Sequence, residues 1–181
     1  MRVISGIFKR RQLKSPKDVR PTEQKVRKAI FDILSDVVKE ASFLELFAGT
    51  GAVGIEAVSN GAKEVCFVEK DIRCIKFLKE NLTGLGVDSF NLSARDVFSA
   101  IALLAKERKA FDVVFLDPPY YQDLAKKTLQ QLVTYDIVKP YGFVVVQHFK
   151  NDSLEDSYGE LSLYTRRRYG TTTLSFYRKE T

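Results

Sequence analysis

Hydrophobic positions along the chain follow two different spacings, and the change between them predicts the order of the elements. From Thr22 to Val37 the apolar residues recur every three or four positions, as on one face of an amphipathic helix, and Thr22 is the expected N-cap. After this helix, short apolar runs that predict buried strands alternate with stretches of helical spacing. The expected strands are Phe43–Phe47, Val65–Glu69, Phe90–Ser93, Val113–Leu116 and Phe143–Gln147. The expected helices between them are Ala52–Ser59, Ile72–Leu82, Val97–Lys106 and Leu124–Val133.

This alternation of strands and helices predicts an α/β fold with a doubly wound, mostly parallel sheet. Near the C-terminus the rhythm changes, because Leu161–Thr165 and Thr171–Tyr177 are two strand-like runs joined by the basic turn 166–170. We expect these runs to form an antiparallel hairpin that closes the edge of the sheet. Ligands of such sheets bind beyond the carboxyl ends of the strands, so the chemistry is expected there.

The basic residues of the chain are concentrated at its N-terminus. The 181 residues are 45% hydrophobic, enough for one sizeable core, and the formal net charge is +6. Residues 1–28 hold ten basic and two acidic side chains, a net of +8 for that segment. A solvated tail remains one interpretation, but apolar residues interleave the charges and favour an ordered segment that contacts nucleic-acid phosphates. We therefore expect a basic extension, 1–22, before a catalytic domain, 23–181. The candidate phosphate contacts are Arg2, Lys9, Arg10, Arg11, Lys14, Arg20 and Arg27.

Several function classes receive little support from composition. No apolar stretch reaches the roughly 18 residues of a membrane span, and the start lacks the apolar core of a secretory signal, so a cytoplasmic protein is expected. The two cysteines, Cys66 and Cys74, do not have the spacing of metal ligands or of a disulfide framework. We expect no metal site.

A glycine-rich loop joins the first expected strand to the helix that follows it. In Gly49-Thr50-Gly51-Ala52-Val53-Gly54, missing side chains let the backbone lie close to a cofactor, and the helix N-terminus favours an anionic group. Glu69 follows Gly49 by 20 residues and ends the next strand, where a carboxylate can accept hydrogen bonds from both hydroxyls of a ribose. The pattern predicts a cofactor that contains a nucleoside.

The loop also fits the dinucleotide pattern G-x-G-x-x-G, so an NAD(P)-dependent oxidoreductase is an alternative. Two features favour S-adenosylmethionine. Glu45 precedes the glycines and would repel a pyrophosphate, whereas it can meet the positive methionine end of S-adenosylmethionine directly or through water. The chain is also too short for the usual dehydrogenase substrate domain. The predicted cofactor contacts are Glu45, Phe47, Ala48, Gly49, Thr50, Gly51, Glu69, Lys70, Asp96 and Val97. Asp96 either accepts the adenine amino group, caps the helix that begins at Val97, or does both.

The most specific pattern is the run Asp117-Pro118-Pro119-Tyr120 at the end of the fourth expected strand. The prolines lack N–H groups and restrict the backbone, so nearby carbonyls can point into a cleft. Asp117 and the Pro118 carbonyl can accept both hydrogens of an exocyclic amine, and Tyr120 can stack on the base. Two acceptors orient this weak nucleophile in line with a methyl donor, and the base must be flipped out or unpaired to reach it. These four residues are the predicted catalytic group.

Taken together, the chain resembles the RsmD-like methyltransferases, which methylate the N2 amine of a guanine in 16S ribosomal RNA of the small subunit. The motifs that carry the resemblance are Arg2-Val3-Ile4-Ser5-Gly6, Arg20-Pro21-Thr22, Val26-Arg27, Phe47-Ala48-Gly49-Thr50-Gly51, Asp117-Pro118-Pro119-Tyr120 and Phe176-Tyr177-Arg178-Lys179. It implies a class I, Rossmann-like fold with seven strands, S-adenosylmethionine as cofactor, and an N-terminal extension that helps hold RNA, with Thr22 among its contacts. The implied partner is an assembled or assembling small ribosomal subunit.

Two residues depart from the family pattern or stay without a function. Glu45 stands where many relatives have Asp, and the longer carboxylate should still serve. Gln147 stands where the family leads us to expect Glu, and we assign it no role. His148 is expected to be structural, because the cationic product amine loses its proton without a histidine base.

Other functions remain open at this point. An adenine-N6 DNA methyltransferase fits the Asp-Pro-Pro-Tyr run equally well, although such enzymes usually carry a separate target-recognition region. Methyltransferases that act on protein glutamine more often have Asn in place of Asp117. A non-catalytic RNA-binding protein is a third alternative, which the intact Glu69 and Asp117 oppose. A monomer is the default expectation.

Overall fold

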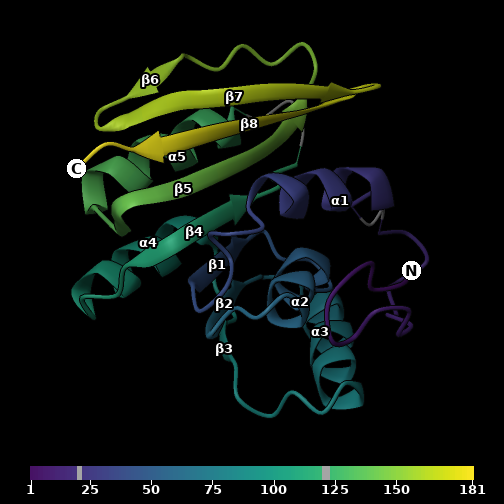
Figure 1. Ribbon diagram of the computed structural model, residues 1–181. Helices are drawn as coiled ribbons and strands as arrows, with labels where there is room; N and C mark the ends of the chain where they lie inside the picture. The colour runs from purple at the N-terminus through teal and green to yellow at the C-terminus, as the bar shows by residue number, and fades with distance from the viewer. Residues whose placement is uncertain (20–21, 120–122) are drawn as a thin grey trace.

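The computed structural model describes residues 1–19, 22–119 and 123–181. Within these ranges the chain forms one eight-stranded sheet in the order β3-β2-β1-β4-β5-β8-β7-β6 (Figure 1). The strands are β1 (Ser42–Leu46), β2 (Glu64–Val68), β3 (Asn91–Ser93), β4 (Phe111–Leu116), β5 (Val138–Phe149), β6 (Ser157–Tyr158), β7 (Leu161–Tyr169) and β8 (Thr172–Lys179). The helices are α1 (Gln24–Ile33), α2 (Ala52–Ser59), α3 (Ile72–Gly84), α4 (Val97–Lys106) and α5 (Leu124–Tyr135).

The sheet is parallel from β3 to β5 and antiparallel from β5 to β6. The chain enters at β1, moves outward through β2 to β3, and then crosses back to β4 on the other side of β1. The strand order therefore reverses between β1 and β4. In open α/β sheets this switch point is where a crevice forms at the carboxyl ends of the strands.

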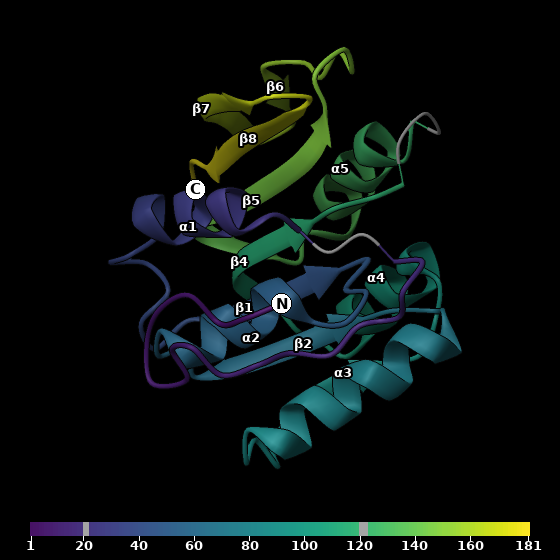
Figure 2. The same ribbon diagram turned by 90° about the vertical axis from the view of Figure 1, so that its right-hand side faces the viewer.

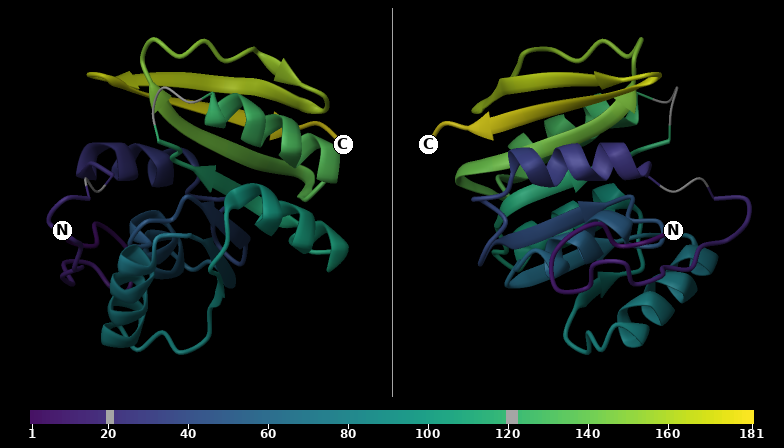
Figure 3. Two further views of the ribbon diagram at one scale, coloured as in Figure 1. Left: turned by 180° about the vertical axis from the view of Figure 1, so that it is seen from behind. Right: turned by 45° about the vertical axis from the view of Figure 1, so that its right-hand side comes forward.

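Two hydrophobic cores lie on the two faces of the sheet. One face is covered by α1, α2 and α3, and the other by α4 and α5, which stand behind the sheet in Figure 1 and in front of it in the left view of Figure 3. Successive strand residues alternate between the cores, as Val113 belongs to the first and Val114 to the second. Burial on both faces explains why these strands are continuous apolar runs in the sequence.

The N-terminal segment is ordered on the body of the protein. Residues 1–19 run past α2 and α3, as Figure 2 shows. Arg2 and Gln12 form an antiparallel bridge, and Val3 and Leu13 are each 2% exposed in the first core. The basic extension is therefore a docked hairpin-like segment, with Val3 and Leu13 inward and Ile7 exposed.

Most of the predicted elements are confirmed, with five main differences. Helix α1 ends at Ile33, although the helical spacing continues to Val37, and β7 runs to Tyr169, so residues 166–169 of the expected basic turn belong to a strand. Helix α1 begins at Gln24 with Glu23 in the N-cap position and no capping side chain, so the predicted N-cap role of Thr22 is wrong. The two-residue strand β6 raises the expected seven strands to eight. Strand β5 starts at Val138, before the predicted start, because its first residues pair with β4 ahead of a register shift. In the ranges given above, none of the helices combines the length and apolarity needed to cross a membrane.

Candidate active site

The register of the sheet brings the ends of β1, β2 and β4 to one level with Val146, three residues before the end of β5. Leu46 of β1 is paired with Val68 of β2 and with Leu116 of β4, and Leu116 is paired with Val146 of β5. The next residue after each of these positions lies at the carboxyl edge. In the order of the strands these residues are Glu69, Phe47, Asp117 and Gln147.

A cavity of about 460 Å³ opens at this edge and includes all four residues in its lining. One of its walls is formed by the N-terminal segment and the start of α1, through Val19, Thr22, Glu23 and Val26. Most of its surface is apolar, and its charged groups come mainly from the strand ends and from the start of α4. Part of the predicted cofactor group, such as Phe47 and Glu69, and the predicted catalytic residue Asp117 therefore face a common space.

The glycine loop has the conformation that glycine favours. Gly49 and Gly51 have φ angles of +55° and +77°, in the left-handed region where a Cβ is disfavoured. A Cβ on Gly54 would lie 2.4 Å from the Phe67 ring and 2.7 Å from a Glu45 oxygen, so Gly54 lets α2 pack directly on the sheet. Phe47 is left-handed too, with φ +55°, and such strain at a non-glycine residue is found at functional sites.

The Glu69 carboxylate is held by three backbone amides. Its Oε2 accepts a hydrogen bond from Gly49 N–H at 2.7 Å, and its Oε1 accepts from Lys70 and Asp71 N–H at 2.8 Å each. A carboxylate offers about four acceptor positions, so about one remains, on Oε2. Glu69 thus fixes the glycine loop against the end of β2 and has about one acceptor position left, whereas the predicted contact with both ribose hydroxyls needs two.

Glu45 does not have the position that the sequence predicted. It is 3% exposed, it is not among the residues that line the cavity, and it accepts hydrogen bonds from Val53 and Gly54 N–H at 3.2 and 2.8 Å. Burial raises the pKa of its carboxyl to about 8. The Glu45 carboxyl thus faces the α2 amides and does not line the cavity, and the predicted contact with the methionine end of the cofactor through water stays a prediction. Glu45 holds the first turn of α2 against the sheet.

The other predicted cofactor contacts divide into two groups. Phe47, Gly49, Lys70, Asp96 and Val97 line the cavity, whereas Ala48, Thr50 and Gly51 do not and form the hidden side of the loop. Asp96 caps α4 by accepting a hydrogen bond from Ser99 N–H at 3.0 Å, and the bonds to Ser99 lower its pKa. The capping role is confirmed, and Asp96 also lines the cavity, while its contact with the adenine amino group stays a prediction.

The predicted catalytic group lies in the same cavity as far as the structure describes it. Asp117, Pro118 and Pro119 line the cavity, and Tyr120 lies outside the described residues. The Thr22 hydroxyl donates a hydrogen bond to Asp117 Oδ2 at 3.4 Å. This bond explains why Thr22 does not cap α1, because its oxygen is turned toward the end of β4.

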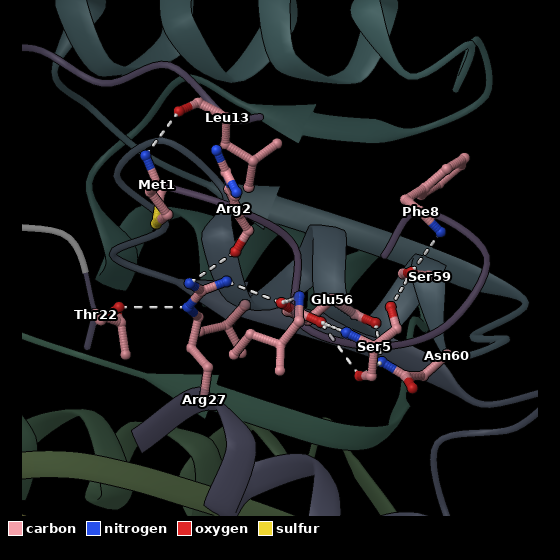
Figure 4. Close-up of polar contacts among 12 residues, drawn as sticks. Met1, Arg2, Ser5, Phe8, Leu13, Thr22, Arg27, Glu56, Ser59 and Asn60 are labelled. Atoms are coloured by element: carbon pink, nitrogen blue, oxygen red, sulfur yellow. Dashed lines mark hydrogen bonds and ion pairs between the residues drawn. The ribbon is translucent and has the colours of Figure 1, made fainter. Parts of the chain in front are cut away.

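Arg27 is buried, contrary to the prediction that it contacts RNA. Its guanidinium is 2% exposed and forms an ion pair with Glu56 of α2, Nη1 to Oε1, at 2.8 Å. It also donates hydrogen bonds to the carbonyls of Arg2 and Thr22, as Figure 4 shows. The Arg27 guanidinium is therefore not accessible to a phosphate group of RNA. Arg27 instead joins α1, α2 and the N-terminal segment.

The remaining predicted RNA contacts keep an accessible position. The basic ones within the described residues are exposed on the N-terminal segment: Arg2, Lys9, Arg10, Arg11 and Lys14, whereas Thr22 is half-buried and lines the cavity. Arg11 also donates a hydrogen bond to the Gly84 carbonyl at 2.6 Å, and Lys14 pairs with Glu80 at 3.3 Å, so both are steadied against α3. Arg20 lies outside the described residues.

Some lining residues were not predicted from the sequence. Phe98 follows Val97 at the start of α4 and lines the cavity, but it is not one of the buried residues of that helix. An apolar residue outside the buried face of a helix can indicate a surface that binds a ligand. Gln147 and Thr172 line the opposite end of the cavity, from β5 and β8. Whether these two residues reach the cavity depends on how β8 pairs with β5, and the sequence of neither strand shows that pairing.

His148 has a structural role. Its Nδ1 faces the Phe149 carbonyl at 3.0 Å, so Nδ1 carries the proton, and Nε2 at 2.9 Å accepts the hydrogen of the Ser175 hydroxyl. Arg166 Nε donates to that hydroxyl at 3.0 Å, and burial lowers the pKa of His148. The neutral ring thus joins β5, β7 and β8. His148 is not one of the residues that line the cavity around Asp117.

The strand order, the glycine loop and the cavity at the switch point define the class of the protein. It is an S-adenosylmethionine-dependent methyltransferase with a Rossmann-like sheet. Its residues 1–178 match the family described as Conserved hypothetical protein 95, and the chain belongs to this family.

Similar proteins cover almost the whole chain. The Bacillus subtilis protein named "Putative rRNA methyltransferase YlbH" is 35% identical over 182 residues, 99% of each chain. Ribosomal RNA small subunit methyltransferase D of Escherichia coli is 30% identical over 183 residues, which are 99% of this chain and 90% of that protein. The structure of a Thermus thermophilus hypothetical protein, TTHA0928, has a TM-score of 0.87 and 33% identity, and covers 100% of this chain and 99% of that chain.

Proposed function

We propose that this protein methylates the exocyclic N2 amine of a guanine in 16S ribosomal RNA. The observation that carries the proposal is the position of Asp117, which shares a cavity with Glu69 and the glycine loop. Asp117 directly follows β4, and Phe47 directly follows the neighbouring strand β1. An acceptor for an amine and a site for a methyl donor are thus about one strand spacing apart, roughly 5 Å. The names of the relatives support ribosomal RNA as the substrate.

The side chains present fit S-adenosylmethionine. Gly49 has no atom within 4 Å of an added Cβ, so the loop faces open space at the point where a cofactor would pass. Glu69, Lys70, Asp96 and Phe98 would hold the nucleoside end, and Phe47 and Gly49 the part nearer the sulfur. The cofactor supplies an electrophilic methyl group on a positively charged sulfur.

The protein contributes position and polarity to the transfer. Asp117 and the Pro118 carbonyl accept the two amine hydrogens, which turns the nitrogen lone pair toward the methyl carbon. The C–N bond formed at the amine would replace the C–S bond of the methyl donor, whose electron pair would stay on the sulfur. The amine becomes positively charged, Asp117 stabilises that charge, and a proton then leaves to solvent. Thr22 positions the Asp117 carboxylate through its hydroxyl.

The N-terminal segment supports the RNA part of the proposal. Its exposed cations, Arg2, Lys9, Arg10, Arg11 and Lys14, lie on the segment whose other end lines the cavity at Val19 and Thr22. A polyanion bound along residues 1–22 would lead its target base to the catalytic domain, 23–181. Action on a small ribosomal subunit would place the protein in the cytoplasm.

The test is transfer of a labelled methyl group from S-adenosylmethionine to small ribosomal subunits that lack the modification. Naked 16S RNA and DNA run in parallel, and the products are digested to nucleosides. Label in N2-methylguanosine from the subunits or the RNA supports the proposal. Label in N6-methyladenine from DNA would support the adenine-N6 alternative, and wild-type protein that binds cofactor but labels none of these substrates would overturn the proposal.

A further inference from the structure

Gln147 has a buried polar atom that the protein leaves without a hydrogen bond. The residue is 7% exposed and lines the cavity at the carboxyl edge of the sheet. Among the described residues, its Oε1 is one of two buried side-chain oxygen or nitrogen atoms without a hydrogen-bond partner. The other, Thr128 Oγ1, belongs to α5 and is not part of the cavity. A buried acceptor without a donor costs about 1–3 kcal/mol. At the wall of a cavity, a ligand can supply the missing donor.

The sheet places Gln147 beside Asp117. Leu116 of β4 is paired with Val146 of β5, so the residues that follow them are neighbours across two parallel strands. The backbones of neighbouring strands are about 5 Å apart. Alternation along β5 puts Gln147 on the same face as Val145, which packs in the core under α1. Thr22 approaches Asp117 from that same side. Gln147 therefore lies at the acceptor end of the cavity, on the far side of Asp117 from Glu69.

We propose that Gln147 reads the Watson–Crick edge of the target guanine, an inference that rests on the proposed function. On this edge the N1–H donor is next to the N2 amine, and O6 follows N1. When Asp117 and the Pro118 carbonyl accept from N2, Gln147 Oε1 accepts from N1–H, and its Nε2 donates to O6. Adenine with its amine at Asp117 presents a lone pair at N1 to Oε1 and is disfavoured. Sites built to hydrogen-bond a group discriminate strongly against analogues that lack it.

The test compares Gln147→Leu with wild type, and with Gln130→Leu on the exposed side of α5 as the matched control. Because Leu removes the unpaired oxygen, the free energy of unfolding should stay equal or rise, and S-adenosylmethionine affinity should be unchanged. Despite this, kcat/KM on small subunits should fall about tenfold or more, through the lost contact to the base. A loss of stability and cofactor binding together with activity, or an unchanged kcat/KM, would overturn the proposal.

Gln147→Glu provides a second variant with a different expectation. A carboxylate keeps the acceptor for N1–H and loses the donor for O6, so its kcat/KM should lie between those of wild type and Gln147→Leu. Equal activity of the Leu and Glu variants would contradict the proposed hydrogen bond from guanine N1–H to residue 147. The failures are distinguishable, because wild type that forms no N2-methylguanosine defeats the proposed function itself, whereas active wild type with an equally active Gln147→Leu defeats only the role of Gln147.

Discussion

Arg27 and Glu56 form a buried ion pair that holds the N-terminal segment in place. The two groups are 2.8 Å apart, are 2% and 0% exposed, and come from α1 and α2. Glu56 Oε1 also accepts a hydrogen bond from Ile4 N–H at 2.6 Å. Burial raises the pKa of Glu56 and lowers that of Arg27, while their mutual attraction opposes both changes. One contact thus links the cavity wall to the body of the protein.

Arg27→Met should destabilise the protein strongly, because Glu56 would remain buried without its cation. Loss of one partner of such a pair costs roughly 3–5 kcal/mol, and the double variant with Glu56→Gln should recover part of it. Urea denaturation measures both effects. Lys28→Met, which removes an exposed pair with Asp32, is the control and should change stability by at most about 1 kcal/mol. Equal stability of the Arg27 and Lys28 variants would contradict the assigned role.

Much of the fold could be predicted because the parallel strands are buried on both faces. Val113–Leu116 and Phe143–Val146 are apolar runs too short for helices, so the sequence itself indicates strands. A charged residue inside the apolar α2 sequence was a signal for a buried ion pair, because Glu56 lies between the fully buried Ile55 and Ala57. The identity of its partner depends on how α1 packs across α2, which no spacing along one helix reveals.

The site was predictable where a motif ends a strand. Glu69 and Asp117 follow apolar strands directly, and parallel pairing then brings them to one edge. The direction of a side chain was not predictable in the same way. Glu45 lies one residue before the last of β1 and turns to the α2 amides, and Gln147 became a lining residue only through its place in the sheet.

Glu69→Ala should weaken S-adenosylmethionine binding about tenfold or more, because it removes the acceptor for the ribose and the hydrogen bond from Gly49 N–H that fixes the glycine loop. Isothermal titration measures the affinity. Glu64→Ala, at the other end of the same strand, is the control and should bind the cofactor as wild type does. Wild-type affinity in Glu69→Ala would exclude Glu69 from the cofactor site.

Asp117→Ala should lower kcat by about 100-fold or more while the affinity for S-adenosylmethionine stays within a few-fold of wild type, because the carboxylate acts on the amine and its developing charge. Single-turnover methyl transfer and a separate binding measurement distinguish the two effects. Asp112→Ala, at the start of β4, should retain turnover. An active Asp117→Ala protein would remove this residue from the mechanism.

Replacing Arg10 and Arg11 together by alanine should weaken RNA binding most at low salt and reduce the slope of log affinity against log salt by about one to two, since each phosphate contact contributes about 0.7–0.9. Filter binding to 16S RNA across a salt series measures this slope. The control is Lys106→Ala/Lys109→Ala, at the end of α4 on the other face of the sheet. Identical slopes for both double variants and wild type would contradict phosphate contact by the N-terminal segment.

Glu45 should make the protein less stable as the pH rises. Burial raises the pKa of its carboxyl from 4.5 to about 8, so between these values the folded protein holds a proton that the unfolded chain releases. Unfolding then releases a proton, and a rise in pH favours the unfolded state. The contribution of Glu45 is fully present below pH 4.5 and is lost as the pH passes 8. Glu45→Gln has no proton to release, so urea denaturation at pH 5 and pH 8 should show a smaller loss of stability than in wild type. A parallel pH dependence of the two proteins would mean that Glu45 is already ionised at pH 5 in the folded state, with its two amide bonds outweighing the cost of burial.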